Sequence, residues 1–326
     1  MDIRQFIISH PQWLTPLIAI LLPLLLIAIG WGVGRLLHHA RRGIIVAACL
    51  SAIILTGWLY GVYVGFRQFE VRRVELAFAD LPPAFDGYTI VQFGDAHVGT
   101  YSGWRKEILQ RAVDSINAQH ADMVVFTGDM QNRMPCEMAP HYKLLSAIDA
   151  PDGVFSVLGN HDYAMYLQVS GSQAEDSLEK TCWMERQFGW KVLNNQNRMI
   201  RRGTDSIFIA GMENDGEGRF PAYGNIQSAL WHVPTTSFVV LLEHDPTSWR
   251  RKILKNCHAQ LTLSGHTHGG QLQLFGWSPA AWRYKEYDGL YQMGDRQLFV
   301  TRGLGGVIPF RFGVSGEIVV ITLRKK

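Results

Sequence analysis

The heptapeptide Gly265-His266-Thr267-His268-Gly269-Gly270-Gln271 places two imidazole side chains one residue apart in a glycine-rich turn. Glycine adopts backbone angles that strain other residues, so we expect this turn to present both rings to one point. The turn follows the run Leu261-Thr262-Leu263-Ser264, which is typical of a short buried strand. The sequence therefore predicts two nitrogen ligands at the end of a strand.

Four earlier polar clusters also follow apolar, strand-like runs. They are Asp95-Ala96-His97, Gly128-Asp129, Gly159-Asn160-His161-Asp162 and His244-Asp245. One such cluster would be an ordinary loop, because Asp and Asn favour turns, but five in order are not expected by chance. Carboxylate and amide oxygens mixed with imidazole nitrogens suit first-row divalent ions, and no thiolate is needed. The set has too many ligands for one ion and about the right number for two.

The runs between these clusters indicate an α/β domain. Strands are expected at 88–93, 123–127, 154–158, 238–242 and 261–264, and helices at 104–117 and 141–148. In open α/β sheets, ligands bind beyond the carboxyl ends of the strands. The five clusters are therefore expected to converge on one crevice.

Composition sets broad limits on the function. The chain has 326 residues, 47% of them apolar, so it can bury a sizeable core. A net charge of +3 without a long basic stripe argues against nucleic acid as a partner. The four scattered cysteines form no CxxC pair and are interpreted as free thiols. Nothing in the sequence indicates an oligomeric state.

Two long charge-free runs, 5–34 and 43–66, precede the α/β region. A helix rises about 1.5 Å per residue, so each run is long enough to cross a hydrocarbon core of about 30 Å. The alternatives are a signal peptide, which is not followed by a second span, and a buried core hairpin. We therefore expect a membrane anchor at 1–70 with transmembrane helices at about 14–34 and 44–66, and a catalytic domain at 71–326.

The orientation of this anchor depends on the basic residues at its ends. Arg35, Arg41 and Arg42 lie in the short connector, which favours a cytoplasmic loop and an external domain. Arg67, Arg72 and Arg73 follow the second run and favour the opposite topology. The compact connector gives a preference for an inner-membrane, multi-pass protein with an external, periplasmic domain.

In their order and spacing, the five clusters resemble those of the calcineurin-like metallophosphoesterase superfamily over roughly residues 88–323. The closing segments around Arg302 and 309–313 are most similar to bacterial membrane-associated phosphoesterases. Gly94 and Ser315 depart from that subgroup, which usually has Ser and Pro there. The resemblance implies an α/β/β/α sandwich, here preceded by two transmembrane helices.

The resemblance also implies roles for individual residues. One ion would be held by Asp95, His97, Asp129 and His268, and the other by Asp129, Asn160, His244 and His266. Asp129 would bridge the two ions, whose identity (Mn²⁺, Fe or Zn²⁺) stays open. His161 would be catalytic, stabilising the phosphoryl group or protonating the leaving oxygen. Asp162 would hold the His161 ring or, alternatively, cap a helix.

The implied activity is hydrolysis of a phosphodiester or pyrophosphate bond, because two bound ions polarise a phosphoryl oxygen and lower the pKa of water. The substrate could be a membrane lipid precursor such as UDP-diacylglucosamine. Alternatives are a phosphomonoesterase or protein phosphatase, or a non-catalytic metal-binding membrane protein. Four aromatic residues and two basic ones at 277–287 suit a bilayer interface, but a packed lid over the core fits them equally.

Overall fold

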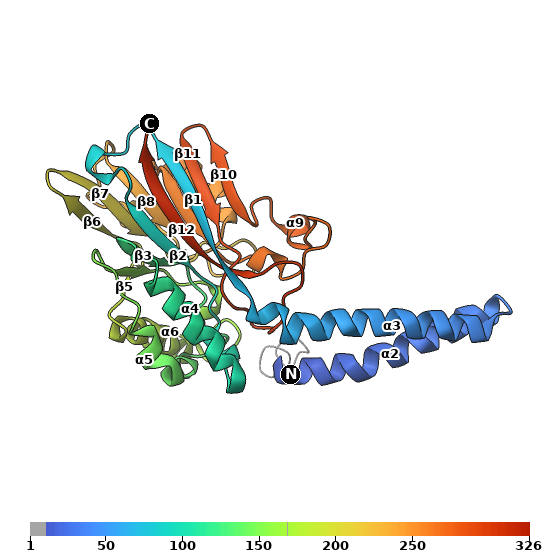
Figure 1. Cartoon of the computed structure of the whole chain (residues 1–326). Coiled ribbons are helices and arrows are strands. Elements are labelled where there is room, and N and C mark those ends of the chain that lie inside the picture. The colour runs from blue at the N-terminus through green and yellow to red at the C-terminus, as the bar shows by residue number, and fades with distance from the viewer. Residues whose placement is uncertain (1–10, 168) are drawn as a thin grey trace.

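The computed structural model describes residues 11–167 and 169–326, and two six-stranded sheets form the centre of its larger part (Figure 1). The first sheet has the order β1 (Phe69–Phe78), β12 (Gly316–Lys325), β2 (Thr89–Phe93), β3 (Met123–Phe126), β4 (Val154–Ser156) and β5 (Lys191–Val192). The second has the order β10 (Gly289–Met293), β11 (Arg296–Val300), β9 (Leu261–Ser264), β8 (Phe238–Leu242), β7 (Asp205–Gly211) and β6 (Gln196–Arg202). Strands β2 to β5 run parallel, as do β7, β8, β9 and β11.

The two sheets pack face to face, and strand β8 shows why its sequence is continuously apolar. Val240 and Leu242 lie in the core between the sheets, whereas Val239 and Leu241 lie in a separate core on the outer face with Trp249. Successive side chains of a strand point to opposite faces, so a strand covered on both sides needs apolar residues throughout.

Helices cover the outer face of each sheet. Helices α4 (Lys106–Asn117), α5 (Tyr142–Leu145) and α6 (Gly171–Gln187) lie on the side of the first sheet (Figure 1). Helix α7 (Ile226–Ala229), the π-turn Trp249–Ile253 and α8 (Leu254–Asn256) contribute Ile226 and Trp249 to the outer core of the second sheet. Helix α9 (Ala280–Arg283) precedes β10. The predicted α/β/β/α sandwich is confirmed.

One predicted helix is much shorter than expected. The segment 141–148 contains only the single turn α5, because Leu145 and Ile148 are its buried apolar residues and they give too small a face to support a longer helix.

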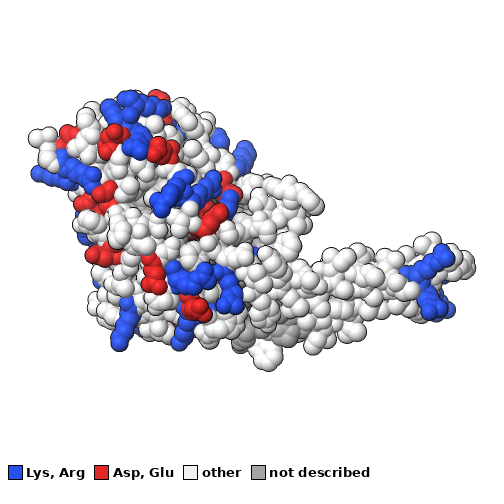
Figure 2. Space-filling view, in the orientation of Figure 1, with Lys and Arg blue, Asp and Glu red and all other residues white. Residues whose placement is uncertain are grey.

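The first part of the chain forms a helical hairpin that projects from the sandwich (Figure 1). Helix α2 (Pro11–Leu36) has 26 residues and α3 (Ala40–Tyr63) has 24, which is about 39 Å and about 36 Å of helix. The windows Leu17–Leu36 and Ala40–Arg67 are long and apolar enough to cross a membrane. Figure 2 shows charge at the far tip and on the sandwich, with an uncharged surface between them. Residues 1–10 of the predicted anchor lie outside the described part of the chain.

Helix α3 is joined to the sandwich through the loop that precedes β12. The Trp58 ring stacks on Phe310 at 4.6 Å, and the Tyr60 ring meets Phe312 edge-on at 5.7 Å. The Arg311 backbone N–H donates to the carbonyl of Gly61 at 3.1 Å. These contacts fix the end of the hairpin against the sandwich.

Candidate metal centre

The predicted ligands come from both sheets and meet at one edge of the sandwich. Asp95 and His97 follow β2, Asp129 follows β3 and Asn160 follows β4, all in the first sheet. His244 follows β8, and His266 and His268 follow β9, in the second sheet. The cluster is therefore formed at the carboxyl ends of strands from two different sheets.

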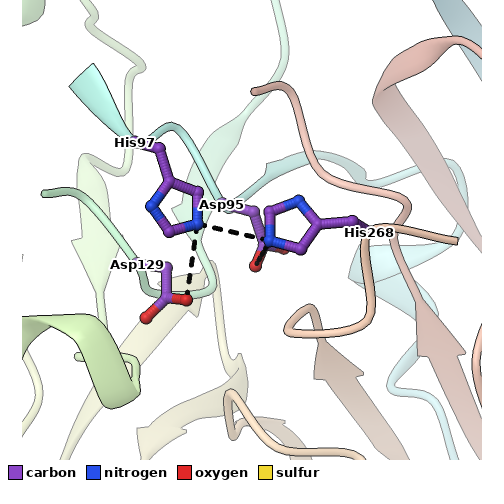
Figure 3. Close-up of side chains that lie close together, drawn as sticks. All are labelled: Asp95, His97, Asp129 and His268. Carbon is purple, nitrogen blue, oxygen red and sulfur yellow. Dashed lines mark hydrogen bonds and ion pairs between the residues drawn. The ribbon is translucent and has the colours of Figure 1, made fainter. Parts of the chain in front are cut away.

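The first group of side chains consists of Asp95, His97, Asp129 and His268 (Figure 3). The Nε2 atoms of His97 and His268 are 3.3 Å apart. Asp129 Oδ2 lies 3.6 Å from His97 Nε2, and Asp95 Oδ1 lies 3.5 Å from His268 Nε2. One candidate ligand atom from each residue lies within 4.8 Å of the others, so a single cation could contact all four.

The second group consists of Asp129, His244 and His266, and Asn160 lies beside it. His244 Nε2 is 3.4 Å from Asp129 Oδ2 and 3.2 Å from His266 Nδ1. Asn160 Oδ1 is 2.8 Å from the same His266 nitrogen. Asp129 belongs to both groups, which is the arrangement expected of a carboxylate that bridges two ions.

Five of these residues have a left-handed backbone. The φ angles are 48° at Asp95, 47° at His97, 61° at Asp129, 73° at His266 and 54° at His268. A residue other than glycine held there costs on the order of 1–3 kcal/mol, and such strain clusters at functional sites. In the final turn, Gly269 and Gly270 have positive φ as expected of glycine, and His266 and His268 adopt such angles too.

Glycine is needed where the strand ends approach each other closely. A Cβ on Gly128, whose φ is 93°, would lie 2.5 Å from the Gly159 nitrogen and 2.8 Å from the His244 ring. A Cβ on Gly94 would lie 2.4 Å from Thr127 Oγ1. The glycine at position 94, where the related subgroup usually has Ser, thus keeps β2 close to β3.

Backbone carbonyls determine which nitrogen of three imidazoles faces the carboxylates. The Nδ1 atoms of His97, His244 and His268 lie 3.2, 2.7 and 3.3 Å from the carbonyls of Gln131, Thr127 and Gly305. An Nδ1–H that donates to a carbonyl leaves the Nε2 lone pair free. Lone pairs and carboxylate oxygens then face one another, so the donor set fits divalent cations.

The electrostatics of the cluster bear on this fit. Burial lowers the pKa of His97 to about 3 and that of His266 to about 4, so both rings are neutral at neutral pH, as a metal-binding imidazole has to be. Burial also opposes protonation of His244, but without a cation the charge of Asp129 outweighs it and raises the pKa of His244 to about 10, so a proton then takes the place of a cation between His244 Nε2 and Asp129. The space next to Asp129 therefore attracts positive charge.

The His161 ring lies beside the His97 ring of the first group, with the two ring centres 4.7 Å apart. Its Nδ1 is 2.7 Å from the carbonyl of Asn132, its ring stacks on Tyr166 at 4.2 Å, and its backbone N–H donates to Asp129 Oδ1 at 2.9 Å. Burial lowers the pKa of His161. The ring is fixed from two sides, by a hydrogen bond through Nδ1 and by stacking on Tyr166.

The expectation that Asp162 holds the His161 ring was wrong. Its carboxylate accepts the backbone N–H groups of Asp129, Met130, Gln131 and Gly159 at 2.9, 3.1, 3.3 and 2.9 Å. The alternative role as a helix cap is closer to the structure, because the Asp162 side chain caps the 3-10 turn Asn160–Tyr163. Its main effect is to bind the loop after β3 to the loop after β4.

Arg311 is a residue of the site that sequence analysis missed. It is fully buried, and its guanidinium donates to the carbonyls of Arg302, Gly303 and Gly305 at 2.8, 3.0 and 2.8 Å. The Gly303 α-carbon in turn packs against the Asp95 side chain. An arginine between two phenylalanines gives no sign in the sequence of this burial.

The sandwich and the paired clusters define a class of metal-dependent hydrolases of phosphate esters. The model of the calcineurin-like phosphoesterase family matches residues 88–270. The chain belongs to that family, and the expected resemblance and hydrolase class are confirmed.

Similar proteins include an uncharacterized metallophosphoesterase, YkuE, of Bacillus subtilis, 32% identical over 82% of this chain and 90% of the relative. A transmembrane protein with a metallophosphoesterase domain from Danio rerio is 29% identical over 90% of this chain and 68% of the relative. Among solved structures, a dimetal phosphatase from Danio rerio shares 15% identity over 73% of this chain and 99% of its own, with a TM-score of 0.39. The transmembrane relative and the two apolar helices indicate a membrane protein.

Proposed function

We propose that this protein is a membrane-anchored phosphoesterase with two divalent metal ions, which hydrolyses a phosphodiester or pyrophosphate bond. The observation that carries the proposal is Asp129, which belongs to both groups of candidate ligands. One ion would be held by Asp95, His97, Asp129 and His268, and the other by Asp129, Asn160, His244 and His266. When bound, such ions polarise the phosphoryl oxygens and lower the pKa of water.

The protein's own groups position the reaction around these ions. The carbonyls of Gln131, Thr127 and Gly305 keep three imidazoles in one tautomer. His161 donates Nδ1–H to Asn132, so its Nε2 is the atom that would hydrogen-bond the phosphoryl group or give a proton to the leaving oxygen. Its lowered pKa makes the protonated ring a strong acid, and the negative charge of a bound phosphate would favour that form.

The anchor would comprise residues 1–70 and the catalytic domain residues 71–326. Helices α2 and α3 support this division, because apart from the arginines at their shared tip they are apolar, and most of their large apolar side chains are exposed. An anchored domain would act on phosphate held at the membrane, and a lipid precursor such as UDP-diacylglucosamine is the class of substrate that fits it.

The side of the membrane decides between lipid substrates. Arg35, Arg41 and Arg42 at the hairpin tip favour a cytoplasmic tip and an external catalytic domain in the inner membrane. A reporter fused to the C-terminus tests this: alkaline phosphatase should be active. An inactive reporter would place the domain in the cytoplasm, where a nucleotide-linked precursor is available.

The activity is tested with the full-length protein loaded with Mn²⁺. Bis-p-nitrophenyl phosphate should be cleaved much faster than p-nitrophenyl phosphate if the enzyme is a diesterase. The reverse order would favour the second candidate, a phosphomonoesterase or protein phosphatase. No cleavage of either ester, or of a lipid pyrophosphate in vesicles, would contradict the proposed function.

A further inference from the structure

An exposed apolar patch lies between the metal centre and the helical hairpin. It is formed by Leu274, Phe275, Trp277 and Trp282, and the rings of Trp277 and Trp282 are 4.8 Å apart. The side chain of Phe275 is fully exposed and that of Trp282 is 82% exposed. Contiguous patches of exposed apolar side chains commonly mark sites of interaction with proteins or membranes. Of the four aromatic residues for which the sequence left a packed lid open, Trp277 and Trp282 are exposed, whereas Tyr284 is half-buried against His266.

The backbone of this patch is built to present Phe275 outward. Leu274 and Trp277 exchange two backbone hydrogen bonds of 2.9 Å across the two residues Phe275 and Gly276. Both central residues have positive φ, 51° and 80°, as in the tight turns that join two strands. A bulky side chain with positive φ is unusual, so the turn holds an apolar ring in solvent at a conformational cost.

The patch is tied to helix α3 on one side. The Gln273 backbone N–H donates to the carbonyl of Phe312 at 2.8 Å, and the Phe312 N–H donates to the carbonyl of Gln271 at 3.0 Å. The neighbouring rings of Phe310 and Phe312 pack on α3 at Trp58 and Tyr60. The position of the turn is therefore set relative to the end of the apolar hairpin.

On the other side, the same segment is tied to the metal centre. Tyr284 Oη lies 3.0 Å from His266 Nε2, and Ser278 Oγ donates to the carbonyl of Gly269 at 2.7 Å. Segment 272–287 thus reaches from the second group of candidate ligands to the exposed rings. Figure 1 shows α9 on the side of the sandwich from which the hairpin projects, and Figure 2 shows an uncharged surface there that continues onto the hairpin.

We propose that segment 272–287 is a membrane-interface element, in which Phe275, Trp277 and Trp282 enter the headgroup layer beside α3. The partner is a lipid bilayer, because the patch is continuous with the apolar hairpin and combines aromatic rings with the basic side chains of Arg283 and Lys285. The inference rests on the proposed anchoring of α2 and α3. Its consequence is that the metal centre opens at the level of lipid phosphates.

The test measures lipid contact directly in the full chain, reconstituted in phosphatidylglycerol–phosphatidylcholine vesicles. A nitrobenzoxadiazole label is attached through Phe275→Cys in a background that lacks the accessible thiols Cys49, Cys136 and Cys257. Trp282→Cys gives a second label site, and Trp231→Cys is the matched control. Trp231 is also an exposed aromatic residue, but it lies next to β6 at the opposite edge of the second sheet.

Nitroxide-labelled lipid should quench the label at position 275 or 282 at least about threefold more than the label at 231, with iodide in water showing the reverse. Equal quenching by lipid at all sites would overturn the proposal. Protection from iodide without quenching by lipid would also overturn it, since a second copy of the chain would then cover the patch.

Two wild-type measurements keep these outcomes separate from the proposed function. Extraction of the protein by alkaline carbonate would contradict the anchor. Failure to cleave bis-p-nitrophenyl phosphate, p-nitrophenyl phosphate and a lipid pyrophosphate with Mn²⁺ would contradict the catalytic assignment, whatever the label reports.

Discussion

Replacing Asp162 with asparagine tests whether this carboxylate holds the loops of the metal centre together. The two side chains have nearly the same shape, but a carboxamide has one acceptor oxygen where the carboxylate has two. The Asp162 carboxylate accepts four backbone N–H groups, from Asp129, Gly159, Met130 and Gln131. In the variant, two of these donors would face an amide NH₂ group and lose their acceptor.

The expected loss of stability follows from these contacts. A buried N–H left without an acceptor costs about 1–3 kcal/mol, so two cost about 2–6 kcal/mol. Burial and the charge of Asp129 raise the pKa of Asp162 to about 7, so removal of the charge recovers part of this cost. We expect a net loss of about 3 kcal/mol in the free energy of unfolding. We also expect a lower affinity for the metal ions, because the loops that carry Asp129 and Asn160 would separate.

Urea unfolding of the full chain in detergent, with metal removed by a chelator, measures the first effect. The intrinsic tryptophan emission reports on it, because Trp190 is buried against Phe93 and Phe126 in the core. Elemental analysis after Mn²⁺ loading measures the second. Asp149→Asn, at an exposed aspartate, is the matched control. An Asp162→Asn variant as stable as this control, with a full complement of metal, would refute the reasoning.

Asp129→Asn should abolish activity by loss of an ion, because Asp129 is common to both groups; two tightly held ions in this variant, by elemental analysis, would contradict that role. His161→Asn should lower kcat by about 10²–10⁴-fold with metal content unchanged; a parallel loss of metal would make His161 a structural residue instead. Arg311→Met should cost about 3 kcal/mol or more in urea unfolding, because three buried carbonyls lose a charged donor; an unchanged midpoint would exclude this contribution. Chelation should lower the thermal midpoint of the wild type and of Asp149→Asn alike, and no shift in either would argue against a resident ion.

Much of the fold could be predicted from local patterns. The strand that ends before His244 needs apolar residues on both faces, and the run 238–242 shows this directly. Helix α4 could be predicted because Ile108, Leu109, Ala112, Val113 and Ile116 recur at helical spacing and all are buried. The length of the helix at 141–148 was overestimated, because the sequence pattern does not show how few of these residues contact the core.

The partners of individual polar side chains could not be predicted in the same way. Asp162 lies next to His161 in the chain, so a contact between their side chains was a reasonable hypothesis. The carboxylate instead faces the loop after β3, which is more than thirty residues away. Arg311 was missed for the same reason, since its acceptors surround it only after the loops before and after it have folded.

The sequence by itself determined the types of ligand, their order after the strands, the two apolar helices and the membership of the family, because each depends on residues that are close along the chain. The tertiary structure alone decided that β2 to β4 and β8 to β9 belong to different sheets whose ends meet. It also decided that five candidate ligands adopt left-handed backbone angles and that Phe275, Trp277 and Trp282 are exposed on a segment bonded to the loop that packs on α3. These features arise from contacts between residues far apart in sequence, and the free energy of packing two sheets and a hairpin together is what holds the strained backbone in place.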